Sequence, residues 1–273
     1  MVSLDKNLIE KVKKFIFSNG RLLERNLFSY FFESGLKEDV LNALKAYQNK
    51  DGGFGNGIEP DLLCPNSTAI GAETALYILD LLEIENHIIF EDLVLWIINA
   101  LNNEGYIKHP PDGLFDYPHQ PWWENPDNKR IFAVAAFLKK FGFEDKNFFS
   151  KVRSFYVKTQ IPEEIQIYDY PYFIYLKSLG ENNEEKKMLQ HIIDRLPSIF
   201  EKNKEHYPLF GRHWYQALDI LDKNVVEDEV NNFFNGLQDD GGLKIIYQNL
   251  PWWRPIWTLD GLIILKKNNL IEF

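Results

Sequence analysis

The sequence predicts an all-α protein built as an (α/α)6 barrel, in which outer helices surround inner ones in about six pairs. Three observations lead to this prediction. Apolar residues recur at helical spacing along nearly the whole chain, the chain repeats itself, and its helical segments alternate between amphipathic and uniformly apolar. No linker rich in Pro, Gly and Ser divides the 273 residues, so we expect a single domain over residues 1–273.

The clearest repeat joins two segments that lie far apart in the chain. Residues 41–55, LNALKAYQNKDGGFG, and residues 230–244, VNNFFNGLQDDGGLK, each form an amphipathic pattern that reaches Gln and then Asp-Gly-Gly. A loop and a second, apolar segment follow each copy, beginning near Ser67 and Pro255. A helix that is apolar on all sides is buried on all sides. We therefore expect the apolar helices inside the barrel and the amphipathic helices outside it.

The other pairs are weaker copies of the same unit. In chain order, the expected outer and inner segments are 8–20 with 21–35, 41–48 with 67–82, 93–105 with 129–142, 148–160 with 168–180, 186–203 with 206–221, and 230–238 with 255–267.

The stretch Gln-x-x-Asp-Gly-Gly-Phe-Gly at residues 48–55, followed by STAIGAETALYIL, resembles the repeat of the terpenoid cyclases and protein prenyltransferase β subunits, the squalene-cyclase type of repeat. A degenerate copy stands at residues 238–243. The resemblance covers most of the chain. It implies an α/α toroid that binds an apolar or isoprenoid-type small molecule in an aromatic-lined central cavity.

The catalytic motifs of those families do not carry over to this chain. Where cyclases that begin by protonation have a DxDD-like acidic motif, the sequence reads Asn66-Ser67-Thr68. The DDxxD motif that holds magnesium diphosphate is absent, and Cys64 lies in a loop without the Asp that accompanies a prenyltransferase zinc ligand. The sequence thus leaves open whether the protein is an enzyme.

Composition excludes several classes of partner. The net charge of -10 disfavours nucleic acid, because binding to phosphates needs a basic face. No apolar run is long enough to span a membrane, and the amino-terminal segment lacks the pattern of a secretory signal, so we expect a cytoplasmic protein. We expect no cofactor, and the oligomeric state is open. His119, His206 and His213 could meet in space, but their spacing specifies no metal.

Loops that lead from outer to inner helices should gather at one mouth of such a barrel, and here they are rich in aromatic residues. Several Trp and Tyr side chains on loops favour a binding cavity for an apolar or sugar-like ligand. The alternative is that each Pro-Trp-Trp segment braces the inner helices. The candidate ligand-binding residues are Tyr117, His119, Trp122, Trp123, Tyr170, Arg212, His213, Trp214, Trp252, Trp253, Arg254 and Trp257.

The same loops carry the candidate catalytic carboxylates Glu59, Asp61, Asp116 and Asp169. Two carboxyl groups across a pocket are what glycoside hydrolysis requires, so a carbohydrate-active (α/α) barrel, either a hydrolase or a lyase, is the second functional hypothesis. A non-catalytic scaffold toroid is the third. Helix capping is the structural alternative for Asp169 and for Asp127, which both precede apolar segments.

Three arginines, Arg130, Arg212 and Arg254, stand near the starts of expected inner helices. A cation at a helix amino end is mildly unfavourable, so each should have an anionic neighbour. That neighbour is either an anionic ligand such as a diphosphate, or one of the loop acids Glu59, Asp61 and Glu124.

Overall fold

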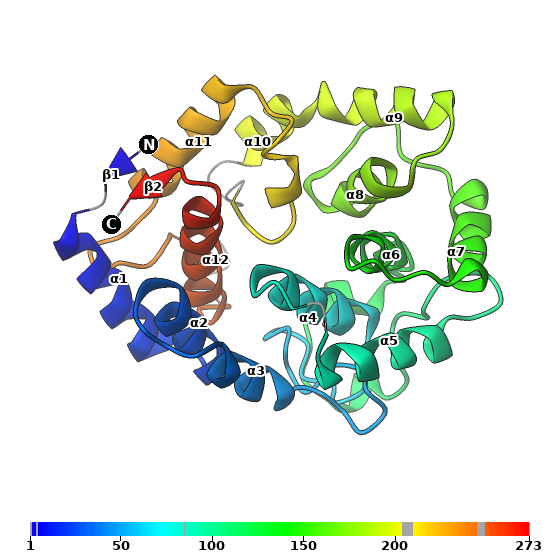
Figure 1. Ribbon diagram of the computed structural model, residues 1–273, viewed down its shortest axis with the longest axis horizontal. Coiled ribbons are helices and arrows are strands. Elements are labelled where there is room, and N and C mark those ends of the chain that lie inside the picture. Colours follow the sequence, from blue (N-terminus) through cyan, green and yellow to red (C-terminus); the bar gives the residue numbers. More distant parts are fainter. Residues whose placement is uncertain (1, 4, 85, 204–209, 245–248, 273) are drawn as a thin grey trace. The chain divides into compact units, whose positions relative to one another are not determined.

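The computed structural model describes residues 2–3, 5–84, 86–203, 210–244 and 249–272 (Figure 1). Contacts divide the chain into two compact units: unit 1 comprises Met1–Ala43 and Ile192–Phe273, and unit 2 comprises Leu44–His191. The all-α prediction is confirmed, since the only strands among the described residues are a two-residue parallel pair. The closure of one six-paired barrel from the whole chain stays a prediction.

Unit 2 alternates amphipathic and buried helices, as the repeat predicts. Its buried helices contact one another in chain order, α4 with α6 and α6 with α8, while the amphipathic helices lie on their outer side (Figure 1). The buried helices are α4 (Ala69–Leu81), α6 (Arg130–Lys140) and α8 (Tyr170–Leu179). The amphipathic helices are α5 (Ile88–Ala100), α7 (Lys146–Lys158) and α9 (Asn183–Ile193).

Unit 1 is assembled from both ends of the chain around one buried helix, α12 (Trp253–Lys267), of which every residue from 255 to 265 is buried. Helices α1 and α2 contact α12 and each other, and the ring of Phe233 in α11 closes on Gly261 of α12, where no side chain would fit. The other elements of the unit are α1 (Lys6–Asn19), α2 (Leu22–Phe32), α3 (Lys37–Lys45), α10 (Leu196–Asn203), α11 (Lys223–Asn235), β1 (Val2–Ser3) and β2 (Ile271–Glu272).

Two expected helices differ from the prediction. The segment 186–203 is split between α9 and α10, because Pro197 is tolerated in the first turn of α10 but not in the interior of a longer helix. The expected inner helix over 206–221 is absent from its described part, residues 210–221, which contain only the short 3-10 helix η4 (Tyr215–Ala217). Gly211 and a run of aromatic residues, all weak helix formers, occupy that segment. His206 lies outside the described residues.

Three similar turns that contain glycine follow amphipathic helices in the repeat. We name them turn A (residues 49–53), turn B (102–106) and turn C (238–242). In each turn, the backbone N–H of the first residue donates a hydrogen bond to the carbonyl oxygen of the fifth residue. Their glycines Gly52, Gly105 and Gly241 have φ of 90°, 94° and 90°, a conformation that favours glycine.

Each turn glycine also lies directly on the backbone of another amphipathic helix. A Cβ atom added at Gly52 would meet the carbonyl oxygen of Asp92 at 2.2 Å, and one at Gly105 would meet that of Lys151 at 2.1 Å. A Cβ atom added at Gly241 would meet the carbonyl group of Lys11 at 2.7 Å. Four residues after each of these carbonyls stands an aromatic residue, namely Trp96, Phe155 and Phe15. Each turn therefore packs on its helix at the same position relative to an aromatic residue, which stands four residues further along that helix.

Within the described residues, no helix is both long enough and apolar enough to cross a membrane.

The docking of turn A predicts a large cost for Gly52→Ala. Positive φ and the clash with the Asp92 carbonyl should together lower the free energy of unfolding by about 2–4 kcal/mol, measured by urea denaturation. Gly142→Ala is the matched control, because Gly142 has φ of 74° but nothing within 4 Å of an added Cβ. It should cost only about 1 kcal/mol. Equal losses in the two variants would contradict the docking role.

Candidate functional site

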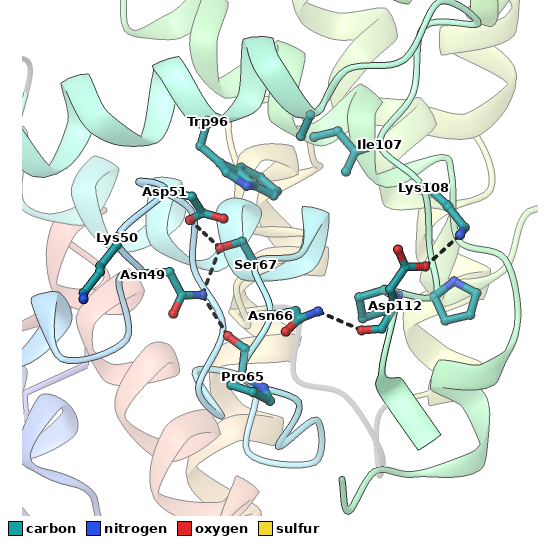
Figure 2. A pocket seen from close by; sticks show the side chains of 13 residues that line it. Asn49, Lys50, Asp51, Pro65, Asn66, Ser67, Trp96, Ile107, Lys108 and Asp112 are labelled. Atoms are coloured by element: carbon teal, nitrogen blue, oxygen red, sulfur yellow. Dashed lines mark hydrogen bonds and ion pairs between the residues drawn. The ribbon is translucent and has the colours of Figure 1, made fainter. Parts of the chain in front are cut away.

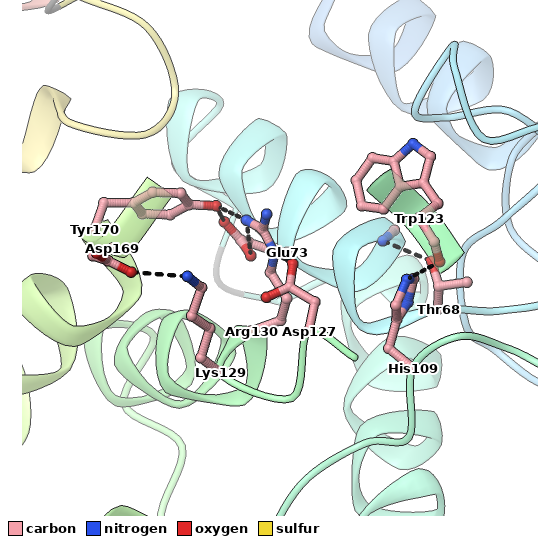
Figure 3. Close-up of polar contacts among 10 residues, drawn as sticks. Thr68, Glu73, His109, Trp123, Asp127, Lys129, Arg130, Asp169 and Tyr170 are labelled. Atoms are coloured by element: carbon pink, nitrogen blue, oxygen red, sulfur yellow. Dashed lines mark hydrogen bonds and ion pairs between the residues drawn. The ribbon is translucent and has the colours of Figure 1, made fainter. Parts of the chain in front are cut away.

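A network of polar side chains lies at the amino ends of the three buried helices of unit 2 (Figure 3). Glu73 comes from the second turn of α4, Arg130 is the first residue of α6, and Tyr170 is the first residue of α8. The Tyr170 hydroxyl donates to Glu73 Oε1, and Arg130 Nη1 donates to the Tyr170 oxygen. Arg130 Nη1 also lies 3.4 Å from Glu73 Oε2. One cluster thus joins α4, α6 and α8.

Two aspartates extend this network, and both are ion-paired. Arg130 Nε donates to Asp127 Oδ2 at 2.6 Å, and Lys129 Nζ donates to Asp169 Oδ1 at 2.8 Å. The other oxygen of Asp169 accepts the backbone N–H of Gln166, and neither α6 nor α8 has a side-chain cap. Neither carboxylate caps the buried helix that follows it: Asp127 pairs with Arg130, while Asp169 pairs with Lys129 and caps the short 3-10 helix Ile167–Asp169 through Gln166.

The two acids around Arg130 are held in different protonation states. Burial raises the pKa of Glu73 to about 7, against the opposing effects of the Arg130 charge and the Tyr170 hydrogen bond. Burial also works to raise the pKa of Asp127, but the charge and hydrogen bond of Arg130 outweigh it and hold that pKa below its usual value. Near neutral pH, Glu73 exchanges a proton while Asp127 stays ionised.

Tyr170 in this network and His109 near it are both uncharged at neutral pH. Burial raises the pKa of Tyr170 well above its usual value, so its hydroxyl keeps its proton. Burial lowers the pKa of His109, whose Nε2 lies 2.9 Å from the carbonyl oxygen of Trp123. The network therefore has one exchangeable proton near neutral pH, on Glu73.

Glu73 is the principal site residue that the loop-based sequence reasoning missed. It stands within the apolar stretch AIGAETALYIL, and its residue is only 6% exposed. A carboxyl group in such a helix is costly unless it is protonated or paired, which makes it a functional candidate. Asp260 is likewise an acidic residue within an apolar stretch, that of α12.

The four predicted catalytic acids have different surroundings. Glu59 is 4% exposed and accepts the hydroxyl of Thr74, the residue next to Glu73, and its charge contributes to raising the pKa of Glu73. Asp61 is 5% exposed, and its carbonyl accepts the N–H of Gln120. Asp169 belongs to the network through Lys129. Asp116 is exposed at the end of the short 3-10 helix Leu114–Asp116.

The aromatic loop over residues 117–123 has both buried and exposed side chains. Trp123 packs in a buried cluster with Leu62, Cys64, Ile70 and Leu114, which confirms bracing for Trp123 and a small buried role for Cys64. The neighbouring Trp122 and Tyr117 are 43% and 42% exposed. His119 is half-buried, with Nδ1 at 2.7 Å from the Tyr117 carbonyl oxygen and Nε2 at 3.4 Å from Glu124.

The predicted ligand-binding residues of unit 1 are also divided between buried and exposed positions. Arg212 Nε donates to the buried Asp260 at 2.9 Å, and its guanidinium group lies 5.9 Å from the ring centroid of Trp253. The rings of Trp253 and Trp257 are 5.7 Å apart. Trp214 is buried, His213 is half-buried and Trp252 is exposed.

All three arginines have acidic partners. Arg130 pairs with Asp127 and Glu73, Arg212 with Asp260, and Arg254 with Asp240. Pairing of these arginines with Glu59, Asp61 or Glu124 stays a prediction. No group of three His, Cys, Asp or Glu residues gathers in a metal-binding arrangement anywhere in the described part of the chain.

The raised pKa of Glu73 predicts a pH-dependent effect of Glu73→Gln. The folded pKa of about 7 lies above the usual 4.5, so the folded protein retains a proton that the unfolded chain releases in this interval. The wild-type free energy of unfolding should therefore fall as pH rises from 4.5 to 7, relative to the variant, which has no titrating group at this position.

Urea denaturation between about pH 4 and about pH 8 measures this difference, which should change by about 3 kcal/mol in favour of the variant. Glu91→Gln, at an exposed position of α5, is the control and should show no such change. A pH-independent difference for Glu73→Gln would contradict the raised pKa.

Comparison with known proteins leaves the site to be interpreted from its own geometry: neither a protein-family model nor a curated protein sequence matches this chain.

Proposed function

We propose that the protein is an acid–base enzyme that binds an apolar, isoprenoid-type small molecule and transfers a proton from Glu73 to an oxygen atom of that molecule. The observation that carries the proposal is the buried carboxyl group of Glu73, with a pKa of about 7, held by Tyr170 and Arg130. A group that exchanges its proton at the working pH is the form of acid that general acid catalysis favours.

The acid strength of Glu73 determines which kind of atom it can protonate. A carboxyl group with a pKa near 7 is too weak to protonate a carbon–carbon double bond readily, but it suits the protonation of a departing or ring-opening oxygen. Alcohols and epoxides of isoprenoid type carry such an oxygen. The absence of a DxDD-like acid from residues 66–68 agrees with this selection.

The surroundings of Glu73 support an apolar substrate with developing positive charge. Tyr170 and Tyr172 lie in the first turn of α8 beside the network, and cations already lie over both rings, Arg130 at 5.4 Å and Lys129 at 5.9 Å. Aromatic faces of this kind stabilise cations by the same attraction that would stabilise a carbocation. The ionised Asp127 supplies a second, negative group near the same point.

Turnover assays test this proposal with isoprenoid alcohols, an isoprenoid epoxide and isoprenoid diphosphates, with products identified by gas chromatography and mass spectrometry. We expect turnover of an oxygen-bearing substrate, and thermal stabilisation of the protein by it. Glu73→Gln should lower kcat by about 10²–10⁴-fold. Asp116→Asn, at an exposed predicted acid, is the control and should retain activity. Full activity of Glu73→Gln, or neither turnover nor stabilisation with any of the compounds, would refute the proposal.

One observation favours carbohydrate chemistry as a second candidate. Glu73 and Asp127 differ in protonation state and contact the same guanidinium group, so they form a close pair of carboxyl groups of the kind that glycosidases use. In that case Glu73 is the acid and Asp127 the base or nucleophile. Release of reducing sugar from oligosaccharides, abolished in both Glu73→Gln and Asp127→Asn, would favour this candidate over the first.

A further inference from the structure

Unit 2 has a groove of about 800 Å3 beside turn A, outside the network around Glu73 (Figure 2). Asn49 and Asp51 of the turn line it together with Ser67 and with Trp96 of α5. Lys108 and Asp112 line it from another loop and form an ion pair of 2.9 Å. The groove thus combines a carboxylate, an aromatic ring and small polar side chains.

The corresponding place at turn C, in unit 1, is filled by an arginine of the chain itself. Asp240 accepts both terminal nitrogens of Arg254, each at 2.8 Å, in a bidentate pair. The same guanidinium group donates through Nε to the carbonyl oxygen of Leu243 at 2.8 Å, and lies 4.7 Å from the ring centroid of Phe15. Turn C is therefore a working guanidinium site, formed by an aspartate and an aromatic ring.

Turn A holds its aspartate and its ring by the same contacts. Asp51 Oδ1 accepts the N–H of Gly53 at 2.9 Å, as Asp240 Oδ1 accepts that of Gly242 at 3.0 Å. A Cβ atom at Gly53 would meet the ring of Trp96 at 2.5 Å, and one at Gly242 would meet the ring of Phe15 at 2.3 Å. In both turns the aspartate accepts the N–H of a glycine that packs on the ring, and at turn A the side chain of Ser67 also lies against this glycine.

Turn B covers its aromatic residue in another way. Tyr106 takes the place of the second glycine, and its ring lies 4.9 Å from that of Phe155. Turn B and turn C thus each cover the docking aromatic residue with a flat group of the chain, a phenol in one case and a guanidinium in the other. Turn A has neither a tyrosine nor an arginine at these positions.

Turn A leaves one oxygen of its carboxylate available. Ser67 Oγ donates to Asp51 Oδ1 at 2.8 Å, while Oδ2 accepts no hydrogen bond from any described residue. Lys50 also lines the groove, but Figure 2 shows its side chain directed away from the Asp51 carboxylate. The net charge of -10 also favours a cationic ligand.

We propose that the groove at turn A binds a guanidinium group between Asp51 and Trp96, presented either by an arginine side chain of a peptide or by a small guanidino compound. The planar cation would pair with the carboxylate and contact the indole, as Arg254 does with Asp240 and Phe15. The carbonyl of Phe54, which corresponds to that of Leu243, already accepts the N–H of Thr68, so it is a weaker acceptor for the ligand than Leu243 is for Arg254. Affinity should therefore be modest, with a Kd on the order of 1 mM. This site does not depend on the chemistry proposed for Glu73.

Nuclear magnetic resonance titration of the full 15N-labelled chain tests the proposal with three probes: arginine amide, the blocked tripeptide Gly-Arg-Gly, and its lysine counterpart Gly-Lys-Gly. We expect amide shifts at turn A and at Ser67 and a shift of the Trp96 indole, with the lysine peptide binding at least about fivefold more weakly. Equal Kd values for the first two probes identify a small guanidino ligand. A Kd at least about tenfold lower for the arginine peptide identifies a polypeptide segment.

Asp51→Asn should weaken arginine binding at least about tenfold, and Glu104→Gln at the corresponding position of turn B is the matched control, which should leave it unchanged. Equal binding of the lysine and arginine peptides, shifts confined to other regions, or unchanged binding by Asp51→Asn would each overturn the proposal. The comparison of arginine with lysine uses the wild-type protein, so it remains decisive even if Asp51→Asn fails to fold.

Discussion

The arrangement of the buried helices in unit 2 depends on neutralising the charge of Arg130. This side chain is only 9% exposed and begins a helix in which every residue from 130 to 138 is buried. An unpaired cation in such surroundings costs several kcal/mol, and the positive end of the α6 dipole adds to that cost. Asp127 compensates locally, whereas Glu73 and Tyr170 compensate from α4 and α8. A single charge thereby fixes how three helices meet at their amino ends.

The same requirement explains why Glu73 keeps its proton. One guanidinium group already has an ionised partner in Asp127, and Glu59 brings further negative charge toward Glu73. A second carboxylate in that desolvated space gains less from Arg130 than it loses in hydration, so its neutral form is favoured until the pH approaches 7. A protonated carboxyl beside a cation is a direct product of the packing, and it links the helical architecture to acid–base chemistry.

Sequence patterns predicted the helices well because apolar periodicity is a local property. They failed over residues 210–221, where apolar residues were present but weak helix formers dominated. The site was harder to predict for a different reason. The contact between Arg130 and Asp127 spans three residues and is readable from spacing, but the contact with Glu73 spans 57. Attention to the loops, where aromatic residues were plentiful, also drew the prediction away from a lone glutamate inside an apolar helix.

The short pair of strands has a consequence for how the chain reaches its fold. Val2 pairs with Ile271, and α1 packs on α12, so unit 1 needs both ends of the chain before its contacts can form. Unit 2 is continuous from Leu44 to His191 and holds its own buried helices. During synthesis it can collapse while α12, which α1 contacts, is still missing, because domains form as soon as their own segments have emerged. Helices α1 and α2 can contact each other early, but the apolar surface that α1 packs on α12 must stay uncovered until α12 arrives, which makes it the surface most in need of protection from aggregation.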